Sequence, residues 1–168
     1  MAVVSSASSL SSVRGTPTII QLRAPGLTTR ALEREANELA ASAQVPVIVS
    51  SRCDVALASG AAGVNLPERD IRASDARKLL GQGLVGRSVH SLAAAREAEG
   101  DGADFVIFGP VWESPSHPGS PLAGIATLER IARAVNIPVL AIGGVTIERI
   151  AECHAAGAAG YAAIGLFR

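Results

Sequence analysis

The chain has 168 residues, of which fifteen are basic, fifteen are acidic and 48% are hydrophobic. This length predicts one domain with enough apolar content to bury a core. The balanced charge argues against nucleic acid as a partner, and no apolar run is long enough to cross a membrane. Because residues 1–15 also lack the apolar segment of a signal peptide, we expect a cytoplasmic protein that binds neither nucleic acid nor membrane.

Short apolar runs alternate with helical patterns along most of the chain. Strands are expected at residues 16–23, 45–50, 63–66, 84–88, 105–108, 139–142 and 160–165. Helices are expected at residues 28–40, 54–59, 74–81, 92–99 and 125–135, and a further one begins after Thr146. The expected N-caps are Thr28 or Thr29, Ser74 and Ser91.

This alternation is typical of repeated βα units that form an all-parallel sheet. An eighth strand could come only from residues 1–15, which carry no clear period and are expected to be a frayed arm or a degenerate first unit. The predicted fold is an α/β (β/α)8 TIM barrel formed by residues 16–168 and trimmed at the N-terminal strand and the C-terminal helix. An open doubly wound sheet is the alternative, although no G-x-G-x-x-G follows the first strand. The gap in the trimmed wall would be covered by the arm or by a partner subunit, which favours a homo-oligomer.

The stretch from Ile137 to Ile147 reads I-P-V-L-A-I-G-G-V-T-I, a buried strand, two glycines and a helix start. Glycines let backbone N–H groups approach an anion closely, and a helix N-terminus adds its positive dipole end. A second strand ending in glycine, Gly165, follows, and late βα loops of a barrel commonly hold phosphate. We predict a phosphate site formed by Gly143, Gly144 and Gly165, where a side chain at Gly144 would block the anion and leave the fold intact. A plain strand-to-helix turn is the alternative.

Several fragments occur together in a fixed order, among them I-I-Q-L-R, G-R-S-V-H-S, F-G-P-V and A-I-G-G-V-T. In these fragments the chain resembles the thiamine phosphate synthase / TenI family from about Thr16 to Phe167. The resemblance implies a (β/α)8 fold, thiamine biosynthesis and a thiazole phosphate as ligand. It also implies one of two enzymatic activities. One branch joins a pyrimidine diphosphate to thiazole phosphate with Mg²⁺, and the TenI branch aromatises a thiazole phosphate carboxylate by moving protons.

The resemblance implies that the diphosphate end of the site is weakened. Gln21 and Arg23 match the motif that grips the diphosphate, but Pro25 stands where the family has a lysine. Ser51 stands where the family has an aspartate that ligates Mg²⁺, which leaves Asp70 as a weak metal ligand, because Mg²⁺ prefers one or two carboxylates plus substrate phosphates.

The loop after residue 108 departs from the family as well. Ser114, Ser116 and His117 replace a T-x-T-K motif, which keeps two hydroxyls for phosphate binding and removes another lysine. Ser88 matches a serine that lies near the diphosphate.

Proton transfer needs a group that titrates near neutral pH, usually a histidine. The catalytic histidine of the tautomerase branch follows F-G, where this chain has Pro110. His117 and His90, with Ser88, are therefore the candidate catalytic residues. His90 could instead cap the helix from Ser91, and His117 could be an exposed bystander.

From these residues we expect a TenI-like thiazole tautomerase that needs no cofactor. An active synthase with Mg²⁺ and a non-catalytic, regulatory phosphate-binding relative are the alternatives.

Overall fold

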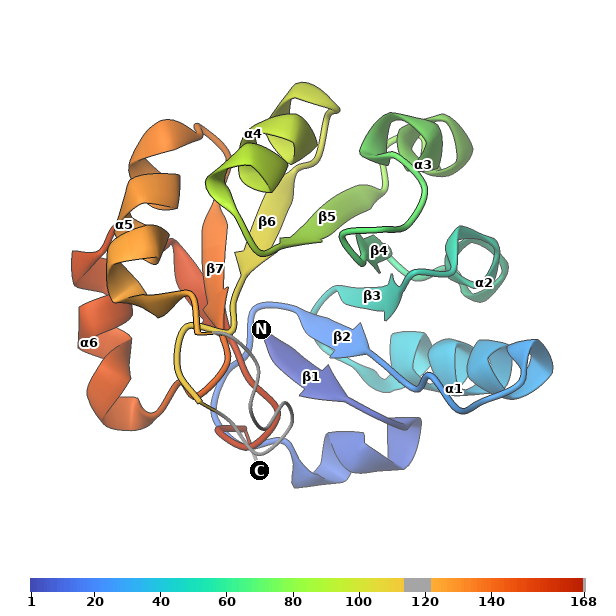
Figure 1. Ribbon diagram of the computed structural model, residues 1–168. Helices are drawn as coiled ribbons and strands as arrows, with labels where there is room; N and C mark the ends of the chain where they lie inside the picture. The colour runs from blue at the N-terminus through green and yellow to red at the C-terminus, as the bar shows by residue number, and fades with distance from the viewer. Residues whose placement is uncertain (114–121, 168) are drawn as a thin grey trace.

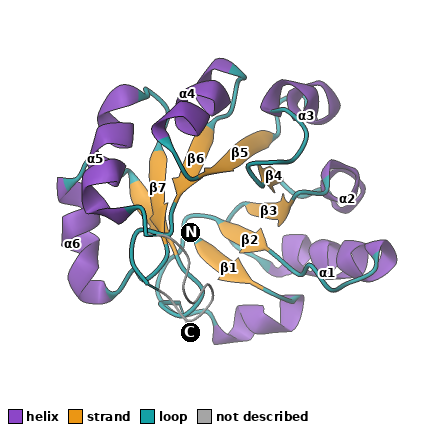
Figure 2. Cartoon of the chain, in the orientation of Figure 1, coloured by secondary structure: helices purple, strands orange, loops and turns teal. Residues whose placement is uncertain are grey.

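The structure, a computed structural model, describes residues 1–113 and 122–167. Its centre is one eight-stranded parallel sheet in the order β1 to β8, surrounded by helices on the outside (Figures 1 and 2). The strands are β1 Ala2–Val4, β2 Ile20–Leu22, β3 Val47–Ser50, β4 Gly63–Leu66, β5 Leu84–Val89, β6 Phe105–Phe108, β7 Val139–Ile142 and β8 Gly160–Ala162. The helices are η1 Ala7–Ser12 (a 3₁₀-helix), α1 Thr29–Ser42, α2 Cys53–Ser59, α3 Ala73–Leu80, α4 Leu92–Gly100, α5 Gly124–Ala134 and α6 Ile147–Ala155.

The sheet closes on itself between its first and last strands. The Val3 N–H donates to the Ala163 carbonyl at 3.0 Å, and the Ala163 N–H donates to the Met1 carbonyl at 3.1 Å. A parallel bridge joins Ala2 to Ala163. The predicted (β/α)8 fold is therefore confirmed.

The expectation of a frayed arm at residues 1–15 is wrong. Ala2–Val4 forms the first barrel strand, pairs in parallel with β2 and is fully buried. The run is too short to show a period in the sequence, but the neighbouring strand and the closing bonds to Ala163 fix it. The first unit does differ from the others, because the six-residue 3₁₀-helix η1 follows its strand where the next six strands are each followed by an α-helix.

Two of the three predicted helix caps are present. The Thr28 hydroxyl accepts from the Ala31 N–H at 3.4 Å, and the Ser91 hydroxyl accepts from the Ala94 N–H at 3.1 Å. Ser74 does not cap: helix α3 already begins at Ala73, and the Ser74 hydroxyl donates to Asp101 at 2.9 Å. A long-range carboxylate partner thus outcompetes the local capping pattern.

Apolar side chains pack in two layers. The larger layer lies between the strands and the surrounding helices, and the smaller fills the barrel interior with residues such as Val3, Ile48, Phe105 and Ile107. Gly86 allows this interior packing, because a Cβ there would lie 2.2 Å from the Phe105 ring. The filled interior leaves the carboxyl ends of the strands as the place where side chains can meet a ligand.

None of the helices in the described ranges combines the length and the apolar composition needed to span a bilayer. After β8 the described chain continues to Phe167 in turns, without another helix. The Phe167 carbonyl accepts from the Arg14 N–H at 2.7 Å, which ties this end to the segment after η1.

Candidate functional site

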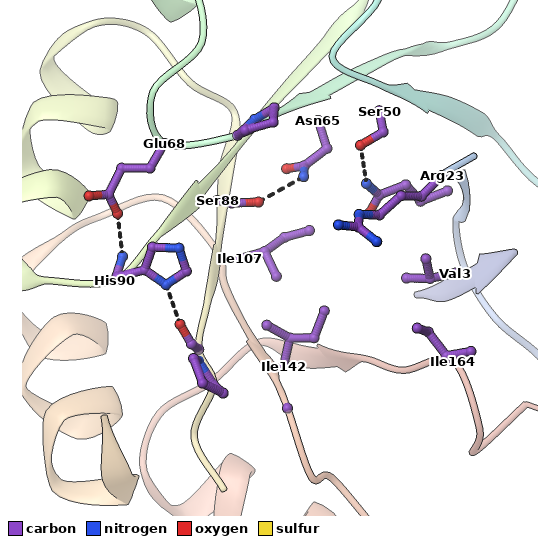
Figure 3. Close-up of a pocket in the computed structure, with 15 residues that line it drawn as sticks. Val3, Arg23, Ser50, Asn65, Glu68, Ser88, His90, Ile107, Ile142 and Ile164 are labelled. Atoms are coloured by element: carbon purple, nitrogen blue, oxygen red, sulfur yellow. Dashed lines mark hydrogen bonds between the residues drawn. The ribbon is translucent and has the colours of Figure 1, made fainter. Parts of the chain in front are cut away.

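A cavity of about 250 Å³ opens where the strands end at the C-terminal face of the barrel. Figure 3 shows that its wall has two kinds of lining. Val3, Ile107, Ile142 and Ile164 form an aliphatic side, and polar side chains from β2 to β5 lie opposite. The cavity therefore suits a small molecule with an apolar face and a hydrogen-bonding edge.

The polar side consists of two amide–hydroxyl pairs. Gln21 Nε2 donates to Ser50 Oγ at 3.3 Å, and Asn65 Nδ2 donates to Ser88 Oγ at 3.0 Å. Gln21 and Asn65 are each only 3% exposed. The Oδ1 atom of Asn65 is buried and has no hydrogen-bond partner among the described residues. An unsatisfied buried acceptor costs about 1–3 kcal/mol, so this oxygen is positioned to accept a hydrogen bond from a ligand or a bound water.

Arg23 follows β2 and is the one arginine or lysine that lines this cavity in the described part of the chain. Its backbone N–H donates to the Val4 carbonyl at 2.8 Å, so the connection to β1 fixes its position, while its side chain is exposed at the mouth. The structure thus brings together the predicted residues Gln21, Arg23 and Ser88.

His90 lies at the edge of the same cavity, two residues beyond Ser88. Its ring Nδ1 is hydrogen-bonded to the Gly109 carbonyl, and its backbone N–H donates to Glu68 Oε2 at 2.6 Å. A carbonyl can only accept, so Nδ1 carries the proton, and in the neutral ring Nε2 remains an acceptor. The capping role considered for His90 belongs to Ser91.

Asp70 is already hydrogen-bonded within the protein. Ser51 Oγ donates to Asp70 Oδ2, and the Ile71 N–H donates to Oδ1 at 2.8 Å. Ser51 adopts a left-handed backbone conformation with φ of 71°, a conformation that non-glycine residues rarely adopt. No group of three His, Cys, Asp or Glu residues in the described ranges is placed to hold a metal ion. Both oxygens of the Asp70 carboxylate thus accept hydrogen bonds within the protein, so a Mg²⁺ ion bound there would compete with Ser51 and would depend on substrate phosphates for further ligands.

A salt bridge directly follows Ser51 in the chain. Arg52 Nε donates to Asp54 Oδ1 at 2.8 Å, and Arg52 Nη1 donates to Thr29 Oγ1 at 3.0 Å. The hydrogen bond from Arg52 lowers the pKa of Asp54 to about 2. Arg52 is therefore already paired with Asp54 and Thr29, and it is not among the residues that line the cavity.

The three predicted glycines line one hollow of about 540 Å³ beside the cavity. Gly143 and Gly144 lie between β7 and α6, and Gly165 follows β8. The hollow and the cavity share Ile142, Gly143 and Ile164 in their linings, so one ligand could reach both. Phosphate binding in this hollow remains a prediction.

The prediction for a side chain at Gly144 is wrong. Gly144 has φ of +65°, and a Cβ there would lie 2.5 Å from the Glu113 carbonyl oxygen and 2.7 Å from Trp112 Cβ. Such a substitution would therefore disturb the loop after β6 and would not selectively fill the anion's space. A Cβ at Gly165 meets nothing within 4 Å, which makes Gly165 the cleaner position to test.

The first residues of the loop after β6 are attached to the loop after β7. The Val111 N–H donates to the Ile142 carbonyl at 2.9 Å, and the Trp112 N–H donates to the Gly143 carbonyl at 3.1 Å. Ser114, Ser116 and His117, which were predicted to bind phosphate or to catalyse, lie outside the described residues.

Among the residues that line these hollows and were not predicted from the sequence are Asn65, Glu68 and Arg149. Asn65 did carry a signal, because it is a polar residue inside the otherwise apolar run Gly63–Leu66, which is buried throughout. Glu68 and Arg149 lie in exposed-looking polar segments, where one sequence gives no indication that they reach a cavity.

A sequence profile for the family described as thiamine monophosphate synthase matches residues 6–167. The chain belongs to this family. A putative thiamine-phosphate synthase 2 from Aquifex aeolicus is 39% identical over 152 residues, which cover 89% of this chain and 82% of the relative. Thiamine-phosphate synthase 2 of Streptococcus pneumoniae serotype 4 is 38% identical over 151 residues, which cover 88% of this chain and 72% of the relative.

A solved structure of the family has the same architecture. The thiamine phosphate pyrophosphorylase from Pyrococcus furiosus superposes with a TM-score of 0.80 at 33% identity, covering 89% of this chain and 74% of that one. The (β/α)8 fold and membership of a thiamine-biosynthesis enzyme family therefore rest on sequence and structure together.

Proposed function

We propose that this chain catalyses a metal-independent proton transfer on a thiazole phosphate carboxylate, as a thiazole tautomerase, and is not a competent Mg²⁺-dependent synthase. The observation that carries the proposal is His90. Its Nδ1 is committed to the Gly109 carbonyl, so its Nε2 is available as a base at the edge of the cavity.

A tautomerisation removes one proton from a carbon of the non-aromatic ring and returns one proton to another carbon. No electrons are lost, and no co-substrate is consumed. Histidine suits both steps, because its ordinary pKa allows it to accept and release a proton near neutral pH. Ser88 Oγ accepts from Asn65, so its own hydroxyl proton is free to donate to the ligand.

The residues around Asp70 support metal independence. Synthase chemistry expels a diphosphate, and the charge on that leaving group needs a metal and fixed cations. Here Ser51 donates to the one remaining carboxylate, and Pro25 and His117 stand where the family has lysines.

The experiment follows the ultraviolet absorption of a thiazole phosphate carboxylate tautomer as it becomes aromatic. We expect turnover that is unaffected by EDTA, and loss of turnover in His90→Gln if His90 is the base. A parallel assay with pyrimidine diphosphate and thiazole phosphate, with and without Mg²⁺, counts thiamine phosphate. Turnover only in the second assay would make the chain a synthase.

The synthase is the second candidate because the relatives at 38–39% identity carry that name. A non-catalytic phosphate-binding relative is the third. It predicts binding of thiazole phosphate by calorimetry without turnover in either assay.

A further inference from the structure

Arg149 is the one basic side chain that lines the hollow of Gly143, Gly144 and Gly165 in the described ranges. Two carboxylates, Glu113 and Glu148, line the same hollow. The pKa of Glu148 is lowered, first by a hydrogen bond with Thr146 and then, among other causes, by the charge of Arg149. Without Arg149 this hollow would repel an anion, so the glycines alone do not explain how a phosphate is held there.

The guanidinium of Arg149 is held at two points. Arg149 Nη1 donates to the Gly144 carbonyl at 2.7 Å, and Arg149 Cζ lies 5.0 Å from the centre of the Trp112 ring. Among the described residues, Nε and Nη2 have no hydrogen-bond partner. A fixed guanidinium with unused donors is suited to two-point recognition of a phosphate.

Arg149 occupies a position in its helix where a cation is disfavoured. Arg149 is the third residue of α6, which begins at Ile147. Cations in the first turn lie at the positive end of the helix dipole, where anions are preferred. Glu148 in the same turn offsets part of this conflict, and a bound phosphate would offset more by placing negative charge between the guanidinium and the helix start.

We propose that Arg149 is the cation that binds the substrate's phosphate in this hollow, and that Trp112 holds it in place. This inference rests on the proposed function only in taking a thiazole phosphate as the ligand. It makes Arg149 a specificity-determining residue, which selects the phosphorylated thiazole over the same thiazole alcohol.

Calorimetry with thiazole phosphate and with the unphosphorylated thiazole alcohol tests the proposal. Arg149→Gln should weaken binding of the phosphate form about tenfold to a hundredfold and leave binding of the alcohol unchanged. Arg149→Lys keeps the positive charge but lacks the planar guanidinium, so its affinity for thiazole phosphate should lie between those of the unmodified protein and Arg149→Gln. Arg133→Gln is the matched control, because Arg133 pairs with Glu129 on α5 and its side chain is 77% exposed.

The sequence contains a single tryptophan, so the emission of Trp112 reports on Arg149 directly. Adding inorganic phosphate or thiazole phosphate should change this emission in the unmodified protein and not in Arg149→Gln. This readout needs no turnover, so it separates failure of the inference from failure of the proposed function.

Three results would overturn the inference. The first is an unchanged ratio of phosphate to alcohol affinity in Arg149→Gln. The second is an equal loss for both ligands, which would mean that Arg149 only supports the loop. The third is an unmodified protein that does not distinguish the two ligands.

Discussion

Between β7 and β8 the mouth of the barrel is built from backbone, whereas between β2 and β5 it is built from side chains. At the first end, Gly143 and Gly144 lie against the loop after β6 so closely that neither has room for a Cβ. At the second end, Gln21, Ser50, Asn65 and Ser88 form the wall through their own polar atoms. The two ends therefore tolerate change differently. A new side chain at the second end changes the polar atoms that face the cavity, whereas a new side chain at the first end displaces a loop.

The largest expected effect tests the side-chain end. Losing one well-placed electrostatic contact costs about 10²–10³ in rate. The family resemblance implies that Pro25 and His117 replace two lysines and that Ser51 replaces a metal ligand. We expect thiamine phosphate formation with Mg²⁺ to be at least about 10³-fold slower than by the S. pneumoniae relative. Pro25→Lys with Ser51→Asp should restore part of this rate, because the barrel and the predicted thiazole phosphate site are already in place. Equal rates for the two unmodified proteins would mean that other residues handle the diphosphate.

The next effect concerns which histidine does the chemistry. General acid–base groups contribute about 10²–10⁴-fold, so substitution of the catalytic histidine by glutamine should lower kcat of the tautomerase at least about a hundredfold. His90→Gln and His117→Gln are to be compared in the same absorbance assay, with His154→Gln on α6 as the control. If kcat falls by less than about threefold, or about 0.7 kcal/mol, in both His90→Gln and His117→Gln, neither histidine is the catalytic acid–base group.

A pair of glycine variants tests the backbone end. Gly144→Ala forces a left-handed alanine against Trp112 and Glu113, and we expect it to destabilise the fold by about 1–3 kcal/mol. Gly165→Ala places its methyl in open space and should leave the melting temperature unchanged while weakening thiazole phosphate binding about tenfold. Thermal denaturation measures the stability of both variants and calorimetry measures their affinity for thiazole phosphate. Together they separate a role in loop packing from a role in ligand binding. A stable Gly144→Ala protein would contradict the tight packing described between the two loops.

The smallest expected effect comes from the salt bridge between Arg52 and Asp54. The pKa of Asp54 lies at about 2, below its ordinary value of 3.8, so its stabilising contribution is present above pH 3.8 and is lost as the pH falls through about 2. The Asp54 side chain is 61% exposed, and solvent screening limits this contribution to a few tenths of a kcal/mol, by a rough measure. In urea unfolding at pH 6, Asp54→Asn should have a lower free energy of unfolding than the unmodified protein by this amount. Near pH 2 the two proteins should have the same free energy of unfolding. A deficit of the same size at both pH values would mean that the charge of Asp54 does not stabilise the fold.

The same contrast explains what the sequence could predict. Runs such as Phe105–Phe108 and Val139–Ile142 predicted strands because burial on both faces requires continuous apolar residues. Gly143, Gly144 and Gly165 were predicted together, since glycine marks backbone that must approach something closely. Ala2–Val4 was missed, because a three-residue strand has no pattern of its own and depends on its neighbours.

Side-chain partners over long distances could not be predicted. The hydrogen bond from Ser51 to Asp70 spans nineteen positions, and that between His90 and Gly109 also spans nineteen. Arg149 reaches Trp112 only because two loops are joined through backbone hydrogen bonds. These contacts depend on the tertiary arrangement, which local sequence does not specify.

The closure between β1 and β8 has a consequence for ligand binding. That closure consists of one parallel bridge and a hydrogen bond from the Met1 ammonium to the Tyr161 carbonyl at 2.7 Å, whereas β4 and β5 pair over four residues. The cavity lies beside the junction of β1 and β8, since Val3 of β1 and Ile164 after β8 both line it. A molecule that fills the cavity would contact both strands that close the barrel. We therefore expect ligand binding to stabilise this closure and to raise the melting temperature of the protein.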